Sequence, residues 1–315
     1  TKSRVSLPCF FFKIMTIFLY IFIVFAFIIS NLFQLFSSIS IENQIIISTF
    51  FIMIVGIPHG SLDHLLLPSK DFKSKLRFYT FYLGLILANL LVWNYSHISG
   101  LILFFIISSY HFGESQLFKF NIKNKITTHF IYLFWGASVI FSFLFYNIDE
   151  LQLLSNSYED TRNLISNINL DLFSYLFVLS NVITLIMFTF FIYNKKVKTN
   201  KVISEVFFLF VIHLSSFLFP LLICFTLFFI ILHSLPSLVN QYNHFKKQNI
   251  EFTIKDFIYL MAPYSLVSIL FLILISFCSY TNVINYSVPL ISIILISVIT
   301  LPHSFIISKF NESLT

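Results

Sequence analysis

Several histidines stand near the ends of long apolar segments, where a titratable side chain is costly. They occur in four short motifs: His59 and His64 in GIPHGSLDH (56–64), His111 in SSYHFGES (108–115), His233 in ILHSLPS (231–237) and His303 in TLPHSF (300–305). Neutral imidazole is a ligand for iron, zinc and copper, and histidines without thiolate or carboxylate ligands are compatible with non-haem iron. The motifs therefore predict a metal site, provided that the fold brings them together.

The composition shows which elements must position these histidines. Of the 315 residues, 58% are hydrophobic and only 10% are charged, and the mean hydropathy is +0.91. Soluble domains carry roughly 25% charged residues, so a chain of this kind cannot face water on all sides. Its apolar runs are continuous over about 18–25 residues and do not alternate, which is typical of membrane-spanning helices.

We therefore predict an all-α, polytopic membrane protein of about ten transmembrane helices, forming one membrane-embedded domain over residues 1–315. The first run is too long for a signal-peptide core and is expected to be a retained span. The pair of runs around Pro220 could also be one broken helix. The expected spans are 9–36, 41–60, 78–95, 98–112, 127–146, 172–193, 202–219, 221–239, 258–280 and 286–307.

Loop charge predicts the orientation. The net charge is +6, but the basic residues sit in short loops between apolar runs, so no nucleic-acid partner is expected. With ten spans, every basic residue except Arg162 falls on one side, which predicts cytoplasmic termini in a multi-pass protein of a cell membrane, here a bacterial inner membrane. The opposite segment 147–171 is acidic, and its Asn and Ser content predicts a loop with little structure of its own. The residues on the basic side are Lys2, Arg4, Lys13, Lys70, Lys73, Lys75, Arg77, Lys119, Lys123, Lys125, Lys195, Lys196, Lys198, Lys201, Lys246, Lys247, Lys255 and Lys309.

The four spans that carry the motifs all run in the same direction. Each motif histidine precedes the next basic residue by about 6–13 positions, roughly 9–20 Å along a helix, so these histidines can share one depth in the cytoplasmic half. A single histidine near a helix end is more often interfacial than a ligand, but four at one depth favour a metal site. The predicted ligands are His59, His111, His233 and His303.

For other residues in or near the motifs, the sequence gives weaker evidence of a role at the metal site. Asp63 could accept the free N–H of a ligating imidazole, or could bond to local backbone at a helix end. His64 faces away from His59 by helical spacing and ranks below it, and His213, in the seventh span, is a spare ligand at the same depth. The glycines of PHG and HFG are expected to end or loosen their helices.

The motifs GIPHGSLDH, SYHFGES, LHS and TLPH, in this order over nearly the whole chain, resemble the Brp/Blh family of bacterial and archaeal membrane proteins. The resemblance implies an Fe(2+)-dependent dioxygenase that uses O2 to cleave the central double bond of beta-carotene, giving two all-trans-retinal molecules for a rhodopsin-type recipient. It also implies that His59, His111 and His233 match iron-ligating positions.

One position departs from the family pattern. The family has a further histidine four residues after the one that matches His233, and here that residue is Ser237. Serine is a poor iron ligand, so either another histidine completes the site or the activity is altered. His303 is the preferred substitute because it lies at the expected depth.

Two other functions fit a membrane protein with buried histidines. A haem b protein needs histidines paired across helices, commonly at two depths, whereas these share one. A transporter could use the histidines to carry protons or substrate, and it often shows inverted repeats, of which the motif pattern gives no sign.

Overall fold

The computed structural model describes residues 7–35, 39–67, 71–120, 122 and 124–314, and every element in these ranges is a helix. Lys2, Arg4, Lys70 and Lys123, which entered the charge argument, lie outside the described residues. The α-helices are α1 (Leu7–Leu35), α2 (Ile41–Phe51), α3 (Ile57–Gly60), α4 (Asp63–Leu66), α5 (Phe72–Tyr95), α6 (His97–Leu117), α7 (Lys125–Tyr146), α8 (Ile148–Asn156), α9 (Glu159–Ser166), α10 (Asp171–Tyr193), α11 (Thr199–Leu218), α12 (Leu221–Leu227), α13 (Leu235–Gln248), α14 (Ile254–Tyr280) and α15 (Val288–Leu314). Two π-helical segments, η1 (Ile52–Gly56) and η3 (Phe228–Ser234), and one 3₁₀ turn, η2 (Phe118–Phe120), complete the elements of the described ranges.

Within the described residues, ten segments are long and apolar enough to cross a membrane, as predicted. They follow the expected order, and several extend past the expected ends; the eighth, for example, covers Leu221–Gln248. The chain breaks at Pro220 into two separate spans, because α11 ends at Leu218 and α12 begins at Leu221. The fold is that of a multi-pass helical membrane protein.

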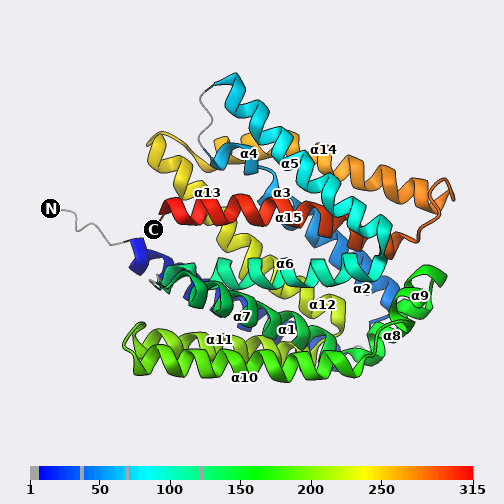
Figure 1. Cartoon of the computed structure of the whole chain (residues 1–315), viewed down its shortest axis with the longest axis horizontal. Helices are drawn as coiled ribbons and strands as arrows, with labels where there is room; N and C mark the ends of the chain where they lie inside the picture. Colours follow the sequence, from blue (N-terminus) through cyan, green and yellow to red (C-terminus); the bar gives the residue numbers. More distant parts are fainter. Residues whose placement is uncertain (1–6, 36–38, 68–70, 121, 123, 315) are drawn as a thin grey trace.

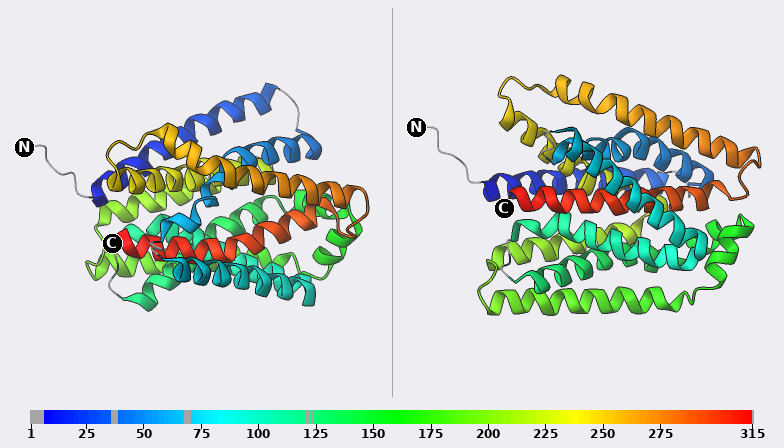
Figure 2. Two further views of the ribbon diagram at one scale, coloured as in Figure 1. Left: turned by 90° about the horizontal axis from the view of Figure 1, so that it is seen from above. Right: turned by 45° about the horizontal axis from the view of Figure 1, so that its top comes forward.

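The long helices run side by side in one bundle (Figure 1). The start of α1 and the end of α15 lie at the same end of this bundle, as an even number of spans requires, and α8 and α9 lie at the opposite end (Figures 1 and 2). Helix α7 and the α12–α13 span are central: in each, 61% of the residues in the most apolar stretch are buried. Helix α14 is peripheral, since only 6% of the residues in its most apolar stretch are buried. The peripheral helices therefore present their apolar side chains to lipid.

The segment 147–171 is not the unstructured loop that was predicted. It contains α8 and α9, which both begin with acidic residues, a pattern that favours helix N-termini. Two of these carboxylates cap other helices: Glu150 accepts the backbone N–H of Leu221 at the start of α12, and Asp160 accepts that of Ser287, just before α15, at 2.6 Å. These contacts, which the sequence does not reveal, explain why the segment is ordered.

The two motif glycines have different roles. Helix α3 ends at Gly60, as expected of the glycine in PHG. The same expectation for HFG is wrong, because α6 continues past Gly113 to Leu117. Gly113 instead allows close packing against α7: an added Cβ would overlap the carbonyl oxygen of Tyr132, and one on Gly136 of α7 would overlap that of Ser109. Small residues permit such backbone contact between membrane helices.

Candidate metal centre

Four imidazole rings from four different spans meet inside the bundle. They are those of His59, His111, His233 and His303, all at most 6% exposed, and we call them the four-histidine cluster. Ring centroids are separated by 5.2 Å for His59–His233, 4.9 Å for His233–His111, 5.0 Å for His111–His303 and 4.6 Å for His303–His59, with interplanar angles of 74–81°. Each ring thus contacts two others, and the four form a closed cycle.

Irregular helix geometry positions two of these rings. His59 lies in α3, which follows directly on η1, and His233 lies within η3. π-helical turns inside α-helices are rare and occur frequently at functional sites. Pro58 and Pro236 each stand at the start of the next α-helical segment, and the span of His233 continues through Pro236 to Gln248.

The nitrogen atoms of the cluster have the pattern expected of metal ligands. The Nε2 atoms of all four histidines are buried without a hydrogen-bond partner in the part of the chain that the structure describes. His59 bonds through Nδ1 to the carbonyl oxygen of Gly56 at 2.7 Å, which places its proton on Nδ1 and leaves the Nε2 lone pair free. Buried polar atoms are rarely unpaired, so several in one place point to an absent partner. Neutral imidazoles of this kind fit a transition-metal ion.

His303 is held by a carboxylate. Its Nδ1 lies 2.9 Å from Oδ1 and 3.0 Å from Oδ2 of Asp63, which is itself 3% exposed. The hydroxyl of Tyr82, on α5, donates to Oδ2 of Asp63 at 3.1 Å. Ligating histidines almost always donate their second N–H to such a partner, which fixes the tautomer and the ring orientation.

The cluster is not uniform. The ligand atoms of His59, His111 and His233 all lie within 4.8 Å of one another, a spacing that one metal ion can bridge. His303 contacts two of these rings, but it does not belong to the group that meets this distance. The geometry is therefore three convergent nitrogens with a fourth imidazole beside them.

Comparison with known proteins agrees with this geometry. A family model described as beta-carotene 15,15'-dioxygenase matches residues 50–311, a range that contains the whole four-histidine cluster. The chain belongs to the beta-carotene 15,15'-dioxygenase family. It is therefore an oxidoreductase of the carotenoid-cleaving type. No curated protein and no solved structure gives a significant match.

Three of the residues considered as weaker candidates make contacts with residues outside the cluster of this dioxygenase. The ring of His64 packs on Tyr264 of α14, with centroids 4.3 Å apart. His213 bonds through Nε2 to the Ser138 hydroxyl at 3.2 Å, in a contact between α11 and α7. The Ser237 hydroxyl accepts a long hydrogen bond of 3.4 Å from the side-chain amide of Gln241.

Some residues around the dioxygenase's cluster were missed by sequence reasoning. Phe229 stacks on His233 with centroids 5.6 Å apart, and Phe112 meets the same ring edge-on at 4.8 Å. Gln241 donates to the backbone carbonyl of His59 at 2.8 Å. The sequence offered two signals: Gln241 stands at helical spacing from His233, and Tyr82 is a tyrosine in an apolar span. Neither residue indicates a site until the fold is known.

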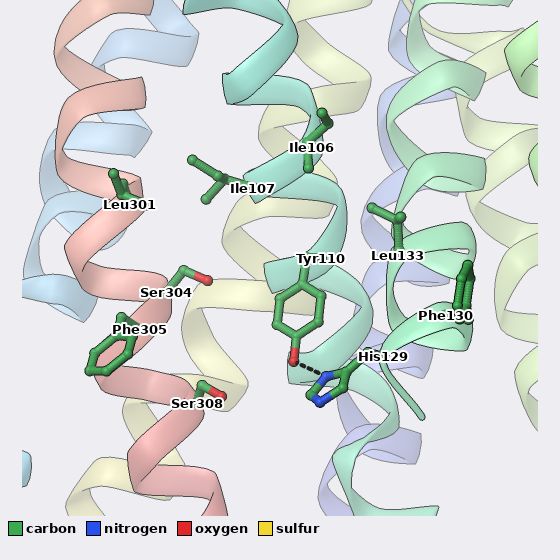
Figure 3. A pocket seen from close by; sticks show the side chains of 10 residues that line it. All are labelled: Ile106, Ile107, Tyr110, His129, Phe130, Leu133, Leu301, Ser304, Phe305 and Ser308. Atoms are coloured by element: carbon green, nitrogen blue, oxygen red, sulfur yellow. Dashed lines mark hydrogen bonds between the residues drawn. The ribbon is translucent and has the colours of Figure 1, made fainter. Parts of the chain in front are cut away.

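A groove of about 500 Å³ lies between α6, α7 and α15 of the dioxygenase (Figure 3). Its lining is almost entirely apolar, and it includes the neighbours in sequence of two cluster histidines, Tyr110 and Ser304. At one end the Tyr110 hydroxyl and the Nδ1 atom of His129 share a hydrogen bond of 2.8 Å.

Proposed function

We propose that the four-histidine cluster binds Fe(2+) and that the protein cleaves the central double bond of beta-carotene with O2, giving two molecules of all-trans-retinal. The observation that carries this proposal is the set of buried, unpartnered imidazole nitrogens in a member of the beta-carotene 15,15'-dioxygenase family. In this reaction the C=C bond breaks, two C=O bonds form, and each aldehyde receives one atom of the O2 molecule.

The residues of the chain supply binding and orientation. His59, His111 and His233 would hold the ion, and His303 would close on it as the fourth ligand. Ferrous iron, when bound, supplies the open coordination positions and the electrons that activate O2. Phe112 and Phe229 pack against His233 and keep the surroundings apolar, as a hydrocarbon substrate requires. No side chain has to act as an acid or a base.

The proposal assigns His303 the place that a histidine at position 237 has in the family pattern. Two contacts support this. Asp63 and Tyr82 fix the His303 ring with its Nε2 atom buried and free, whereas the Ser237 hydroxyl is engaged by Gln241. His303 contacts the rings of both His59 and His111, so it borders the place where the other three histidines would hold an ion.

The cluster geometry disfavours the two other functions. A haem needs a slot between two imidazoles that is as wide as the macrocycle, but each ring here contacts two others at centroid distances of 4.6–5.2 Å. In a transporter, alternating exposure requires a site that opens to either side, and all four rings are buried among four spans.

The remaining elements of the proposal concern the membrane. We place residues 1–315 in one membrane-embedded domain of a bacterial inner membrane, with both termini in the cytoplasm. Basic residues at the start of α5 and α7, just after α10 and at the end of α13 support this orientation, since positive charge favours the cytoplasmic side. Retinal released into the bilayer would be available to a rhodopsin-type recipient.

Expression in a bacterium that makes beta-carotene tests the proposed reaction. The wild-type chain should remove the orange colour and produce retinal. The His111→Ala variant, present in the membrane at equal amount, should do neither. Retinal formation by this variant, or none by the wild type with iron bound, would overturn the proposal.

A further inference from the structure

The groove between α6, α7 and α15 has the form of a binding site for a small apolar molecule. Its volume of about 500 Å³ lies within the range of roughly 300–1,000 Å³ that is usual for ligand sites. Two phenylalanines of its lining, Phe130 and Phe305, are 52% and 42% exposed. They lie on α7 and α15, so the groove opens sideways, towards the lipid.

One polar group in this groove has no partner. Ser304 is only 6% exposed, and its hydroxyl forms no hydrogen bond within the described residues. Serine and threonine in a membrane helix normally donate to the preceding turn, as Ser292 does to the carbonyl of Val288 at 2.8 Å and Thr300 to that of Ile296 at 2.6 Å. Ser304 is on the same helix, and in Figure 3 it points from α15 across the groove towards α6.

The other polar groups of the groove are already paired. Tyr110 and His129 bond to each other, and the Ser308 hydroxyl donates to Glu114 at 2.8 Å. Of the three hydroxyl groups that line the groove in the described residues, only that of Ser304 is thus without a partner. A ligand that matches this groove would carry one hydrogen-bond acceptor at the end of a hydrocarbon chain.

The position of Ser304 relates the groove to the cluster. Ser304 directly follows His303 on α15, and Tyr110 directly precedes His111 on α6. Consecutive helical residues point about 100° apart, so the groove and the cluster lie at one depth on different sides of the contact between α6 and α15. The groove is therefore a separate site next to the cluster, and a product formed at the cluster would have to pass from one to the other.

We propose that this groove binds the aldehyde product, a retinal-type polyene, with its carbonyl oxygen accepting a hydrogen bond from Ser304. The inference rests on the proposed function. The substrate fits less well, since beta-carotene is a hydrocarbon without an acceptor. The stretch from Leu301 to Ser308 also spans only roughly 10 Å of helix, which suits half of the polyene better than the whole. The groove would hold one product molecule at the edge of the bilayer before its release.

A comparison of two ligands tests this assignment on the full-length purified protein. The probes are all-trans-retinal and the analogue in which a methyl group replaces the aldehyde. The wild type should bind retinal about five-fold more tightly than the analogue, as one hydrogen bond predicts. Ser304→Ala should abolish this preference, and the matched control Ser292→Ala should keep it because the Ser292 hydroxyl is already paired within its helix.

A second variant tests the place of binding. Leu133→Trp, which fills the groove from α7, should weaken the binding of both probes. Equal binding of both probes to the wild type would identify the groove as a general site for lipid chains and would overturn the proposal. An unchanged preference in Ser304→Ala would do the same. Binding needs no turnover, so these results are independent of whether the protein cleaves beta-carotene; a protein that binds retinal at Ser304 but forms none would refute only the proposed reaction.

Discussion

The Nδ1 atom of His303 lies 2.9 Å from the Oδ1 atom of Asp63, and the two residues are 240 positions apart in the chain. Both side chains are buried, and a third, that of Tyr82, donates to the same carboxylate. The contact fixes the imidazole so that its Nε2 atom is left for another partner. It is the strongest support for His303 as the fourth ligand of the proposed iron site.

The first prediction concerns this contact. Asp63→Ala should lower iron affinity about 10–100-fold, because partners of ligating histidines contribute to affinity on this scale. Tyr82→Phe should have a smaller effect of the same sign, since it removes one of the bonds to the carboxylate and leaves the His303–Asp63 pair. Iron titration of the purified variants measures both. Equal iron affinity of Asp63→Ala and the wild type would show that His303 does not bind the metal.

The second prediction concerns the departure from the family pattern at Ser237. His303→Ala should reduce retinal formation as strongly as His233→Ala does. In the His303→Ala background, Ser237→His should restore part of the bound iron, since position 237 lies one helical turn beyond His233. Retained iron and retained activity in His303→Ala would show that three histidines suffice.

Much of this fold could be predicted from the sequence because lipid imposes a strong constraint. Each span must be a long apolar helix, so ten spans and their order follow from hydropathy alone. The meeting of His59, His111, His233 and His303 follows from their similar distance to the basic loops on spans that run in one direction. The family resemblance, which the comparison confirms, rests on the same motifs.

The rest depends on contacts between distant residues. A π-helical turn such as η3 shifts the register without a distinctive composition, so the direction of His233 could not be foreseen. Glycine looks the same in sequence whether it ends a helix, as Gly60 does, or admits a neighbouring backbone, as Gly113 does. Similarly, the Asn and Ser content of 147–171 indicated a loop, because the targets of its carboxylates, the N-terminal ends of α12 and α15, are remote in the chain.

The third prediction tests the role of the glycines between α6 and α7. Gly113→Ala and Gly136→Ala should each lower stability by about 1–3 kcal/mol or more, because the new methyl group forces the helices apart. Gly84→Ala is the matched control: an added Cβ there meets no atom within 4 Å, so stability should be unchanged or slightly raised. Thermal unfolding in detergent gives the comparison. A neutral Gly113→Ala would contradict the close packing of α6 on α7.

The fourth prediction concerns topology. A reporter fused after Thr315 should be cytoplasmic, and one inserted at Ser157, between α8 and α9, should be external. This follows from the positive-inside rule and an even number of spans. A cytoplasmic signal from the Ser157 insertion would reverse the proposed orientation but leave the fold intact.

The most direct test of the central claim is retinal formation by the purified, metal-stripped protein as Fe(2+) is added back under O2 and beta-carotene. Activity should rise in proportion to iron and reach a plateau at about one ion per chain, as a single site of three or four imidazoles predicts. His111→Ala should form no retinal at the same iron concentrations. Retinal formation without iron, or equal activity in His111→Ala, would contradict the assignment of the four-histidine cluster as the catalytic centre.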